Sequence, residues 1–167
     1  MICGVALGSN LGDRAANLRR GVELLVQRVP RCRIIERGGV YETEPVDCAP
    51  GTQAFLNTVI EIEAPCTPQE LHSHLAAIEV ELGRPTVREK NAPRTLDLDL
   101  LYAGDVVSAD PALVLPHPRL HLRRFVLRPL ADIRPDLKLP GHELTIAEHL
   151  AALRDDPSCV KRVSDTW

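Results

Sequence analysis

Residues 93–102 set the strongest limit on how this chain folds, because leucine and aspartate alternate within them over residues 96–100. In a β-strand, residues two apart share a face, so Asp97 and Asp99 lie on one side with their Cα atoms about 7 Å apart. The leucines take the other face, which must be buried. Two adjacent like charges raise the free energy of a strand unless a cation lies between them. The run therefore predicts a strand with an apolar core face and a cation-binding aspartate face.

The aspartate pair and the loop before it indicate which ligand binds. Carboxylate oxygens without histidine or cysteine beside them suit magnesium better than zinc. Residues 83–93 show no apolar period, and the cations in and next to them are Arg84, Arg88, Lys90 and Arg94. Magnesium that bridges phosphates, with arginines taking the remaining charge, describes a polyphosphate pocket. A solvated basic loop would explain these cations alone, but loop and strand together favour a functional site.

Length and composition bound the rest of the interpretation. A chain of 167 residues is expected to form one domain, 1–167, with a single core. The net charge of −3 gives no bulk attraction to nucleic acid or to anionic membranes, so neither is expected as a partner. Five cysteines without metal-type spacing indicate reduced thiols. No stretch is long and apolar enough to span a membrane. We expect a soluble, cytoplasmic monomer.

The order of predicted elements indicates the fold class. Strands are predicted over residues 2–7, 33–36, 40–43, 55–63, 93–102 and 106–107. Helices are predicted near residues 18–29, 68–82, 120–130 and 146–153, followed by a polar tail. The leading part of this order is the split β-α-β pattern of a ferredoxin-like α+β fold. That fold has a mostly antiparallel sheet with helices on one face, and the last two helices are additions to it.

The strand at 55–63 divides its side chains between two faces. Its core face is expected to carry Leu56, Thr58, Ile60 and Ile62. The other, less buried face carries Phe55, Asn57, Val59 and Glu61. A planar polar ligand can stack on the phenylalanine and form hydrogen bonds with the asparagine. The asparagine can equally bond to the backbone of its neighbours, so this position alone does not decide between a site and a structural role.

Local patterns predict where the first two helices begin. Thr67, followed by a proline and by Glu70, has the sequence of a capping box. Asn10 or Asp13 is expected to cap the first helix, because the nearby glycines match no phosphate-loop motif. Glu79, near the end of the second helix, is interpreted as a surface residue that lies close to the apolar stripe and toward the basic loop.

Six short motifs resemble a known family in their order and sequence. They occupy residues 7–12, 41–45, 55–57, 83–84, 93–99 and 116–119. The chain is similar over about residues 2–135 to the 6-hydroxymethyl-7,8-dihydropterin pyrophosphokinase family, and the Pro-Arg-Thr-Leu-Asp-Leu-Asp segment is the most specific part. Members of this family transfer the terminal pyrophosphate of ATP to the hydroxymethyl oxygen of a reduced pterin and release AMP, a step in folate synthesis.

The resemblance implies roles for the residues on the nucleotide side. Asp97 and Asp99 resemble the carboxylates that hold two magnesium ions on the triphosphate. Arg84 and Arg94 resemble the catalytic, mobile-loop arginines that meet the phosphates. The loop 84–93 is expected to close over bound ATP. Further nucleotide contacts are implied for His117, Arg123 and Leu100.

The resemblance also implies where the pterin binds. The ring is expected to lie between Phe55 and Phe125, with Asn57 reading its polar edge. The backbone before that strand is expected to assist, through Thr43, Pro45 and Val46. Two other classes stay open at this point: a non-catalytic nucleotide-binding regulatory module, and an RNA-binding domain on the same fold. The latter needs a basic, aromatic sheet face, whereas the predicted face is acidic.

Overall fold

The structure is a computed structural model, and it describes residues 1–44, 53–84, 93–153 and 159–167. Its strands are β1 (Ile2–Ser9), β2 (Arg33–Arg37), β3 (Val40–Thr43), β4 (Phe55–Glu63), β5 (Asp97–Ala103), β6 (Ser108–Asp110), β7 (Leu113–Leu115) and β8 (Val160–Ser164). Its helices are α1 (Arg14–Arg28), α2 (Pro68–Glu81), α3 (Arg124–Ile133) and α4 (Ile146–Ala152), with a 3₁₀ turn, η1, at Leu120–Leu122.

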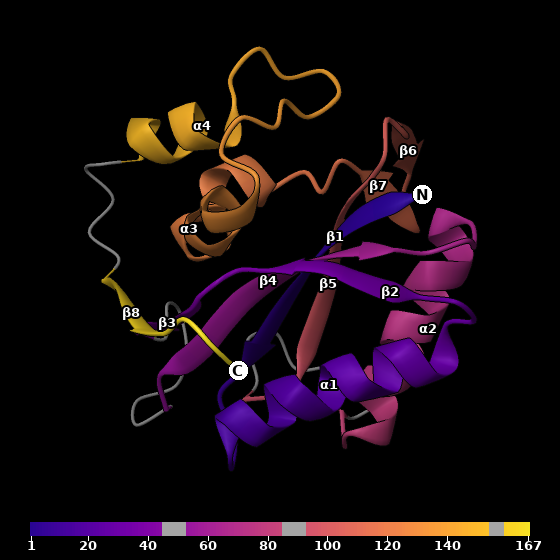
Figure 1. The fold of residues 1–167 in the computed structure, drawn as a ribbon, viewed down its shortest axis with the longest axis vertical. Helices are drawn as coiled ribbons and strands as arrows, with labels where there is room; N and C mark the ends of the chain where they lie inside the picture. The colour runs from indigo at the N-terminus through magenta and orange to yellow at the C-terminus, as the bar shows by residue number, and fades with distance from the viewer. Residues whose placement is uncertain (45–52, 85–92, 154–158) are drawn as a thin grey trace.

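Six of the strands form one central sheet. Their order is β5-β1-β4-β3-β8, and β2 also pairs with β4 (Figure 1). The pairings described within this sheet are antiparallel. The long strand β4 has β1 along one edge, whereas β2 and β3 follow each other along the other edge and are separated at Gly38 and Gly39. The predicted α+β class with a mostly antiparallel sheet is confirmed.

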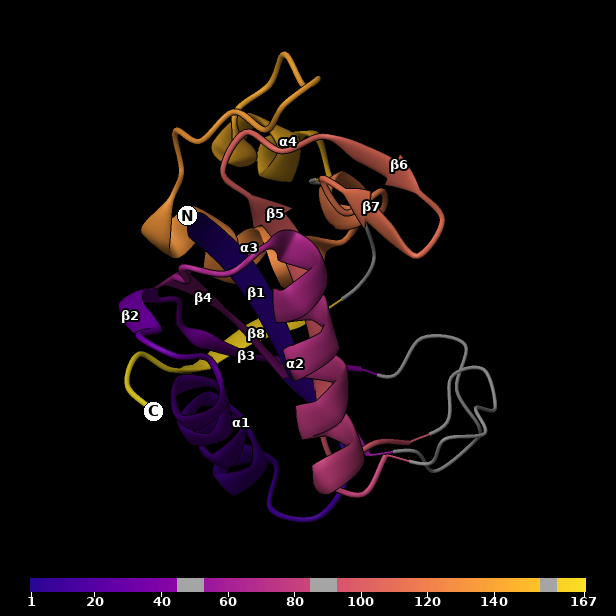
Figure 2. The ribbon, with the colours of Figure 1, turned by 90° about the vertical axis from the view of Figure 1, so that its right-hand side faces the viewer.

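Helices cover both faces of this sheet, so the expectation of one open face was wrong. Helices α1 and α2 lie on one face (Figure 2), over a cluster that includes Leu18, Ile60 and Leu75. Helices α3 and α4 lie on the other face, over a second cluster that includes Val59 and Leu127. The apolar side of α3 requires burial, and the sheet supplies it. This helix covers only part of its face and leaves one end of the sheet for a pocket.

Strand β4 is therefore buried on both sides. Val59 and Glu61, expected on the less buried face, are 0% and 1% exposed because α3 packs over them. The Glu61 carboxylate accepts a hydrogen bond from the Tyr102 hydroxyl at 2.7 Å and lies 3.2 Å from the Arg134 guanidinium. These partners offset the cost of burying its charge.

Both predicted helix starts are confirmed. The Thr67 hydroxyl accepts a hydrogen bond from the Glu70 amide, and the Glu70 carboxylate accepts one from the Thr67 amide, which completes the capping box at α2. Of the two residues proposed to cap α1, Asp13 does so, since its carboxylate accepts from the Ala16 amide at 2.9 Å. Each cap satisfies amides that have no partner within the helix.

The C-terminal third differs from the prediction in three places. The short strand expected at 106–107 begins two residues later, as β6, and pairs with β7. The helix expected near 120 begins only at Arg124, after the 3₁₀ turn η1. The tail that was expected to be merely polar contains β8, which pairs with β3 at the edge of the sheet. The helix at 146–153 is confirmed as α4.

Candidate active site

A cavity of about 360 Å³ lies at the end of the sheet that α3 leaves uncovered. Its described lining includes residues of β1, β3, β4, β5, the first turn of α3 and β8. The predicted site residues that line it are Thr43, Phe55, Asn57, Arg84, Arg94, Asp97, Asp99, Arg123 and Phe125. Residues separated by more than 80 positions in sequence thus meet in one cavity.

The register of three strands forms the floor of this cavity. Asp97 lies opposite Gly8 across one strand pair, and Gly8 lies opposite Asn57 across the next. Directly opposed residues project from the same face of a sheet, so the carboxylate and the amide face one cavity. A Cβ on Gly8 would lie 3.1 Å from the Asn57 Oδ1 atom. No role was expected for Gly8 from the sequence, but its missing side chain keeps the floor of the cavity open.

The two aspartates face arginine side chains. The Asp97 Oδ1 atom lies 3.0 Å from Nη1 of Arg84 and 2.9 Å from Nη1 of Arg94. The Asp99 Oδ2 atom accepts a hydrogen bond from Nη1 of Arg123 at 3.1 Å. Both carboxylates stay partly open to solvent, with 27% and 36% of their side chains exposed. The cavity therefore holds negative and positive groups within reach of each other and of a bound ligand.

Glu79 is buried beneath this cluster, so its interpretation as a surface residue was wrong. The side chain is 5% exposed, accepts a hydrogen bond from the Leu98 amide at 2.8 Å and pairs with Arg84. Burial raises the pKa of this carboxyl to about 7, although the Leu98 amide and the Arg84 charge act in the opposite direction. A signal was present in the sequence, because Glu79 follows Leu75 by four positions and so lies on the apolar stripe of α2.

Asn10, which the sequence suggested only as a possible cap of the first helix, holds the backbone of Arg94. The Asn10 side-chain oxygen accepts a hydrogen bond from the Arg94 amide at 2.8 Å, and the Asn10 amide donates to the Arg94 carbonyl at 3.2 Å. Asn10 is fully buried at the end of β1. This pair of bonds sets where the arginine enters the cavity.

Aromatic and amide groups form the other half of the cavity. The Asn57 Nδ2 atom donates to the Thr43 hydroxyl at 2.7 Å, which leaves the amide oxygen toward the floor. Phe55 begins β4 and Phe125 lies in the first turn of α3, so the rings come from different layers. The guanidinium of Arg123 lies 5.7 Å from the centre of the Phe125 ring.

The remaining expected site residues either lie outside the described part of the chain or do not line the cavity. Pro45 and Val46, and residues 85–92 of the proposed closing loop, lie outside the described part of the chain. Leu100 is 3% exposed in the core cluster beneath α1 and α2, because strand alternation turns it away from Asp99. His117 does not line the cavity. Its backbone amide donates to the Leu101 carbonyl at 2.8 Å.

The electrostatic environment of His117 nevertheless links it to the cavity. Burial lowers the pKa of this imidazole, the positive charges of Arg123 and Arg119 lower it further, and the negative charge of Asp99 opposes them. A histidine with a lowered pKa is neutral near pH 7, so one ring nitrogen can accept a hydrogen bond.

The donor chemistry of the cavity fits magnesium that arrives with a ligand. Asp97 and Asp99 offer oxygen atoms, the donors that magnesium prefers, and both are accessible from the cavity. Among the residues that the structure describes, no three acidic, histidine or cysteine side chains gather to hold a metal ion. Magnesium usually binds through one or two carboxylates, water and substrate phosphates, which is the set this cavity can complete.

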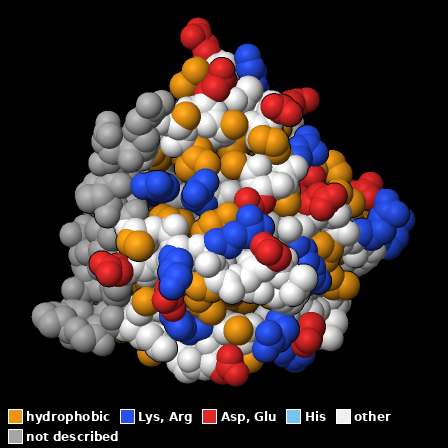
Figure 3. Space-filling view, turned by 60° about the vertical axis from the view of Figure 1, so that its left-hand side comes forward, with side chains coloured by type: hydrophobic (Ala, Val, Ile, Leu, Met, Phe, Trp, Pro, Cys, Tyr) orange, Lys and Arg blue, Asp and Glu red, His pale blue; other side chains and the backbone are white. Residues whose placement is uncertain are grey.

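Figure 3 shows a face on which acidic and basic side chains are interspersed rather than gathered into one basic patch. None of the described helices has the length and apolar character that a bilayer crossing requires.

In this α+β fold, an antiparallel sheet places two carboxylates and four arginines beside aromatic and amide groups, an arrangement typical of phosphate-transferring enzymes. Residues 4–135 match the sequence model of the 7,8-dihydro-6-hydroxymethylpterin-pyrophosphokinase (HPPK) family. The chain belongs to this family, as the resemblance predicted.

Curated relatives agree with this assignment. A 2-amino-4-hydroxy-6-hydroxymethyldihydropteridine pyrophosphokinase of Methylorubrum extorquens is 44% identical over 161 residues, which are 95% of this chain and 96% of that protein. Proteins of the same name from Bacillus subtilis and Pseudomonas aeruginosa are 43% and 39% identical, over 77% and 81% of this chain and 75% and 82% of their own lengths.

Solved structures show the same fold at low sequence identity. A crystal structure of wild-type Plasmodium falciparum HPPK-DHPS with pteroate is similar over 93% of this chain, with a TM-score of 0.67 and 15% identity. An HPPK-DHPS in complex with substrates is similar over 92% of this chain, with a TM-score of 0.69 and 12% identity. This chain spans 43% of each of those longer chains.

Proposed function

We propose that this protein transfers the pyrophosphoryl group of ATP to the hydroxymethyl oxygen of 6-hydroxymethyl-7,8-dihydropterin, giving AMP and the pterin diphosphate in folate biosynthesis. The observation that carries the proposal is the single cavity that joins a carboxylate and arginine half to an aromatic and amide half. The first half suits a triphosphate and the second suits a flat, hydrogen-bonding heterocycle. Pyrophosphoryl transfer requires both to be held side by side.

On the nucleotide side, the aspartates bind the metal ions and the arginines bind the phosphates. Asp97 and Asp99 are the residues that would hold magnesium, in the form of two ions, at the triphosphate of ATP. Bound magnesium supplies charge neutralisation at the phosphate oxygens. Arg84 and Arg94, which pair with Asp97 at 3.0 and 2.9 Å, exchange this carboxylate for phosphate oxygens when ATP enters. Further contacts to the nucleotide are assigned to Arg123 and His117, and Leu100 serves through its backbone only.

On the pterin side, the aromatic rings position the acceptor. Phe55 and Phe125 stack on the two sides of the ring, while the Asn57 amide and the backbone near Thr43 bind its polar edge. The hydroxymethyl oxygen then lies beside the phosphates, attacks the β-phosphorus, and the bridge from that phosphorus to the α-phosphate breaks as AMP leaves. Arginines placed at the developing charge can accelerate phosphoryl transfer by roughly 10³ to 10⁵.

Product analysis tests this function. Purified protein, ATP, magnesium and the reduced pterin are incubated, and nucleotides are separated at several times. We expect AMP only when the pterin is present, and none with Asp97→Ala. An exposed acidic residue outside the cavity, Asp105, provides the matched control, because Asp105→Ala should keep full turnover. Formation of ADP would instead show an ordinary kinase, and ATP binding without turnover would favour the regulatory-module hypothesis.

The proposal extends to how the chain operates. Residues 1–167 act as one catalytic domain, and the protein works as a cytoplasmic monomer. The support for one domain is that residues from β1 through to β8 line the same cavity. Sedimentation analysis of the active protein tests the monomer, since a dimer at assay concentration would contradict it.

A further inference from the structure

Strand β8 contributes to the cavity although it lies outside residues 4–135, the part matched by the family's sequence model. It forms one edge of the central sheet, beside β3. Its first residue, Val160, lines the cavity together with residues of β3 and β4. The sequence pattern did not predict this strand, so Val160 was not among the expected site residues.

The strand register shows which part of the cavity Val160 faces. Thr43 lies opposite Phe55 on one side and opposite Val160 on the other. Because directly opposed residues share a face of the sheet, all three side chains project toward the cavity. Phe55, Thr43 and Val160 therefore form a row across three strands, and Val160 lies at its far end. This row belongs to the aromatic half of the cavity, away from Asp97 and Asp99.

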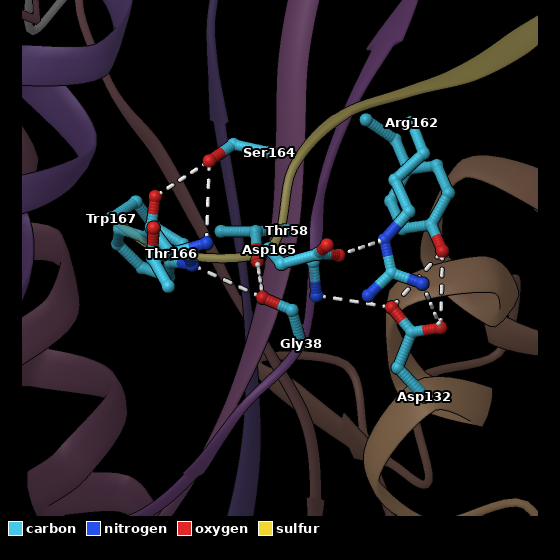
Figure 4. Close-up of polar contacts among 10 residues, drawn as sticks. Gly38, Thr58, Asp132, Arg162, Ser164, Asp165, Thr166 and Trp167 are labelled. Atoms are coloured by element: carbon cyan, nitrogen blue, oxygen red, sulfur yellow. Dashed lines mark hydrogen bonds and ion pairs between the residues drawn. The ribbon is translucent and has the colours of Figure 1, made fainter.

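Helix α3 fixes the position of this edge strand (Figure 4). The Asp132 carboxylate accepts hydrogen bonds from the Gly39 amide and the Tyr41 hydroxyl, both at 3.0 Å, and lies 3.5 Å from the Arg162 guanidinium. The Arg162 guanidinium also lies 5.7 Å from the centre of the Tyr41 ring. One carboxylate thus joins β3, β8 and the helix that carries Phe125.

The residues after β8 anchor it at its other end. The Trp167 indole N–H donates to the Gly38 carbonyl at 3.0 Å, and the Trp167 carbonyl accepts from the Arg37 guanidinium at 3.1 Å. Figure 4 shows the bond from Trp167 to Gly38 together with the bond from the Thr58 hydroxyl to the same Gly38 carbonyl. Contacts of Arg162 within the strand and of Trp167 after it therefore hold β8 beside β3.

We propose that Val160 is a specificity-determining residue, whose side chain closes the pterin half of the cavity and limits which ring substituents a pterin can carry. This inference rests on the proposed function, because it takes the pterin to lie between Phe55 and Phe125. A β-branched side chain has restricted rotamers and forms a wall of fixed shape. It offers no hydrogen bond, so it faces a nonpolar edge of the ring while Asn57 binds the polar edge.

Two substitutions on β8 test whether Val160 limits the space for the pterin, one at Val160 and one at a position that does not line the cavity. Val160→Phe should raise the KM for 6-hydroxymethyl-7,8-dihydropterin by about tenfold or more and leave the KM for ATP nearly unchanged. Val163, which is 47% exposed and is not among the residues that line the cavity, provides the control, because Val163→Phe should change neither constant. Equal effects of the two substitutions, or a parallel rise of both KM values, would overturn the proposal.

A substitution that enlarges the cavity gives an independent test. Reduced pterins that each carry one extra methyl group at a different ring position are compared with the parent pterin. Val160→Ala should improve the relative kcat/KM for at least one of them by about tenfold over the unsubstituted protein. No gain for any methylated pterin would refute the wall, even if Val160→Phe failed to fold.

Binding without turnover separates this inference from the proposed function. Pterin fluorescence is titrated with each variant in the presence of magnesium and a non-hydrolysable ATP analogue. If the unsubstituted protein binds pterin but forms no AMP, the proposed reaction is wrong, whereas weaker pterin binding by Val160→Phe alone still supports the wall. Identical pterin affinities of Val160→Phe and Val163→Phe would refute it whatever the reaction.

Discussion

Adding one methyl group to the cavity floor should reduce activity without reducing stability. In Gly8→Ala the new Cβ lies 3.1 Å from the Asn57 Oδ1 atom and projects into the cavity. One methyl group in a binding pocket changes kcat/KM by roughly 10- to 200-fold, so we expect at least a tenfold loss for the pterin. Alanine is about 0.5–1 kcal/mol more favourable than glycine inside a strand, and the tight contact offsets part of this gain. The Tm should therefore stay constant or rise by up to about 3 °C.

The same substitution four residues earlier should have the opposite effect. In Gly4→Ala the Cβ would lie 2.2 Å from the Tyr102 Cε1 atom, and that ring is held by its bond to Glu61. Overpacking of this kind costs about 1–3 kcal/mol. Thermal unfolding and steady-state kinetics of both variants measure the contrast, and Gly4→Ala should keep its KM values. If Gly8→Ala retained full pterin kcat/KM, or if it unfolded as early as Gly4→Ala, the assignment of Gly8 to the cavity floor would be wrong.

Three further predictions concern charged groups. Arg94→Ala should cut turnover by roughly 10³-fold or more with little change in urea unfolding; equal loss of both would contradict its role. Glu79→Leu leaves the Leu98 amide without its acceptor and should cost about 1–3 kcal/mol in the same assay, more than Glu79→Gln, which can keep that bond. Burial, and then the neighbouring imidazole charges, lower the pKa of His142 and of His149 below the usual 6.5. As the pH falls, the unfolded chain therefore protonates these two histidines before the folded protein does, so the free energy of unfolding should fall as the pH drops below about 6.5. If replacing both histidines by glutamine left this pH dependence unchanged, the prediction would be refuted.

Local signals account for the elements that the sequence predicted well. The capping box of Thr67 and Glu70 depends on residues three positions apart, and it is present. The alternation around Asp97 likewise depends on neighbouring residues, and it places both aspartates in the cavity. These patterns are readable because each interaction forms within one turn or one strand.

The misjudged elements depend on contacts between distant segments. Strand β8 is mostly polar and becomes a strand because β3 offers it an unpaired edge. Both faces of β4 are buried because α3, more than 60 residues later, packs over one of them. For the site, the motif resemblance placed Phe125 correctly in the cavity, whereas the roles of Gly8 and Val160 depend on the strand register. The place of Glu79 on the apolar stripe was readable from the sequence, but its bond to the Leu98 amide depends on how α2 packs on the sheet.

The separation between the two halves of the cavity is a property of the backbone. Asp97, Gly8 and Asn57 lie on three consecutive strands, so the carboxylate and the amide stand two interstrand spacings apart, about 10 Å. Hydrogen bonding between strands sets this length, and side-chain substitutions cannot stretch it. In the proposed reaction, this spacing holds the phosphate donor and the pterin acceptor at a constant distance, while substitutions of the surrounding side chains change which substrates fit.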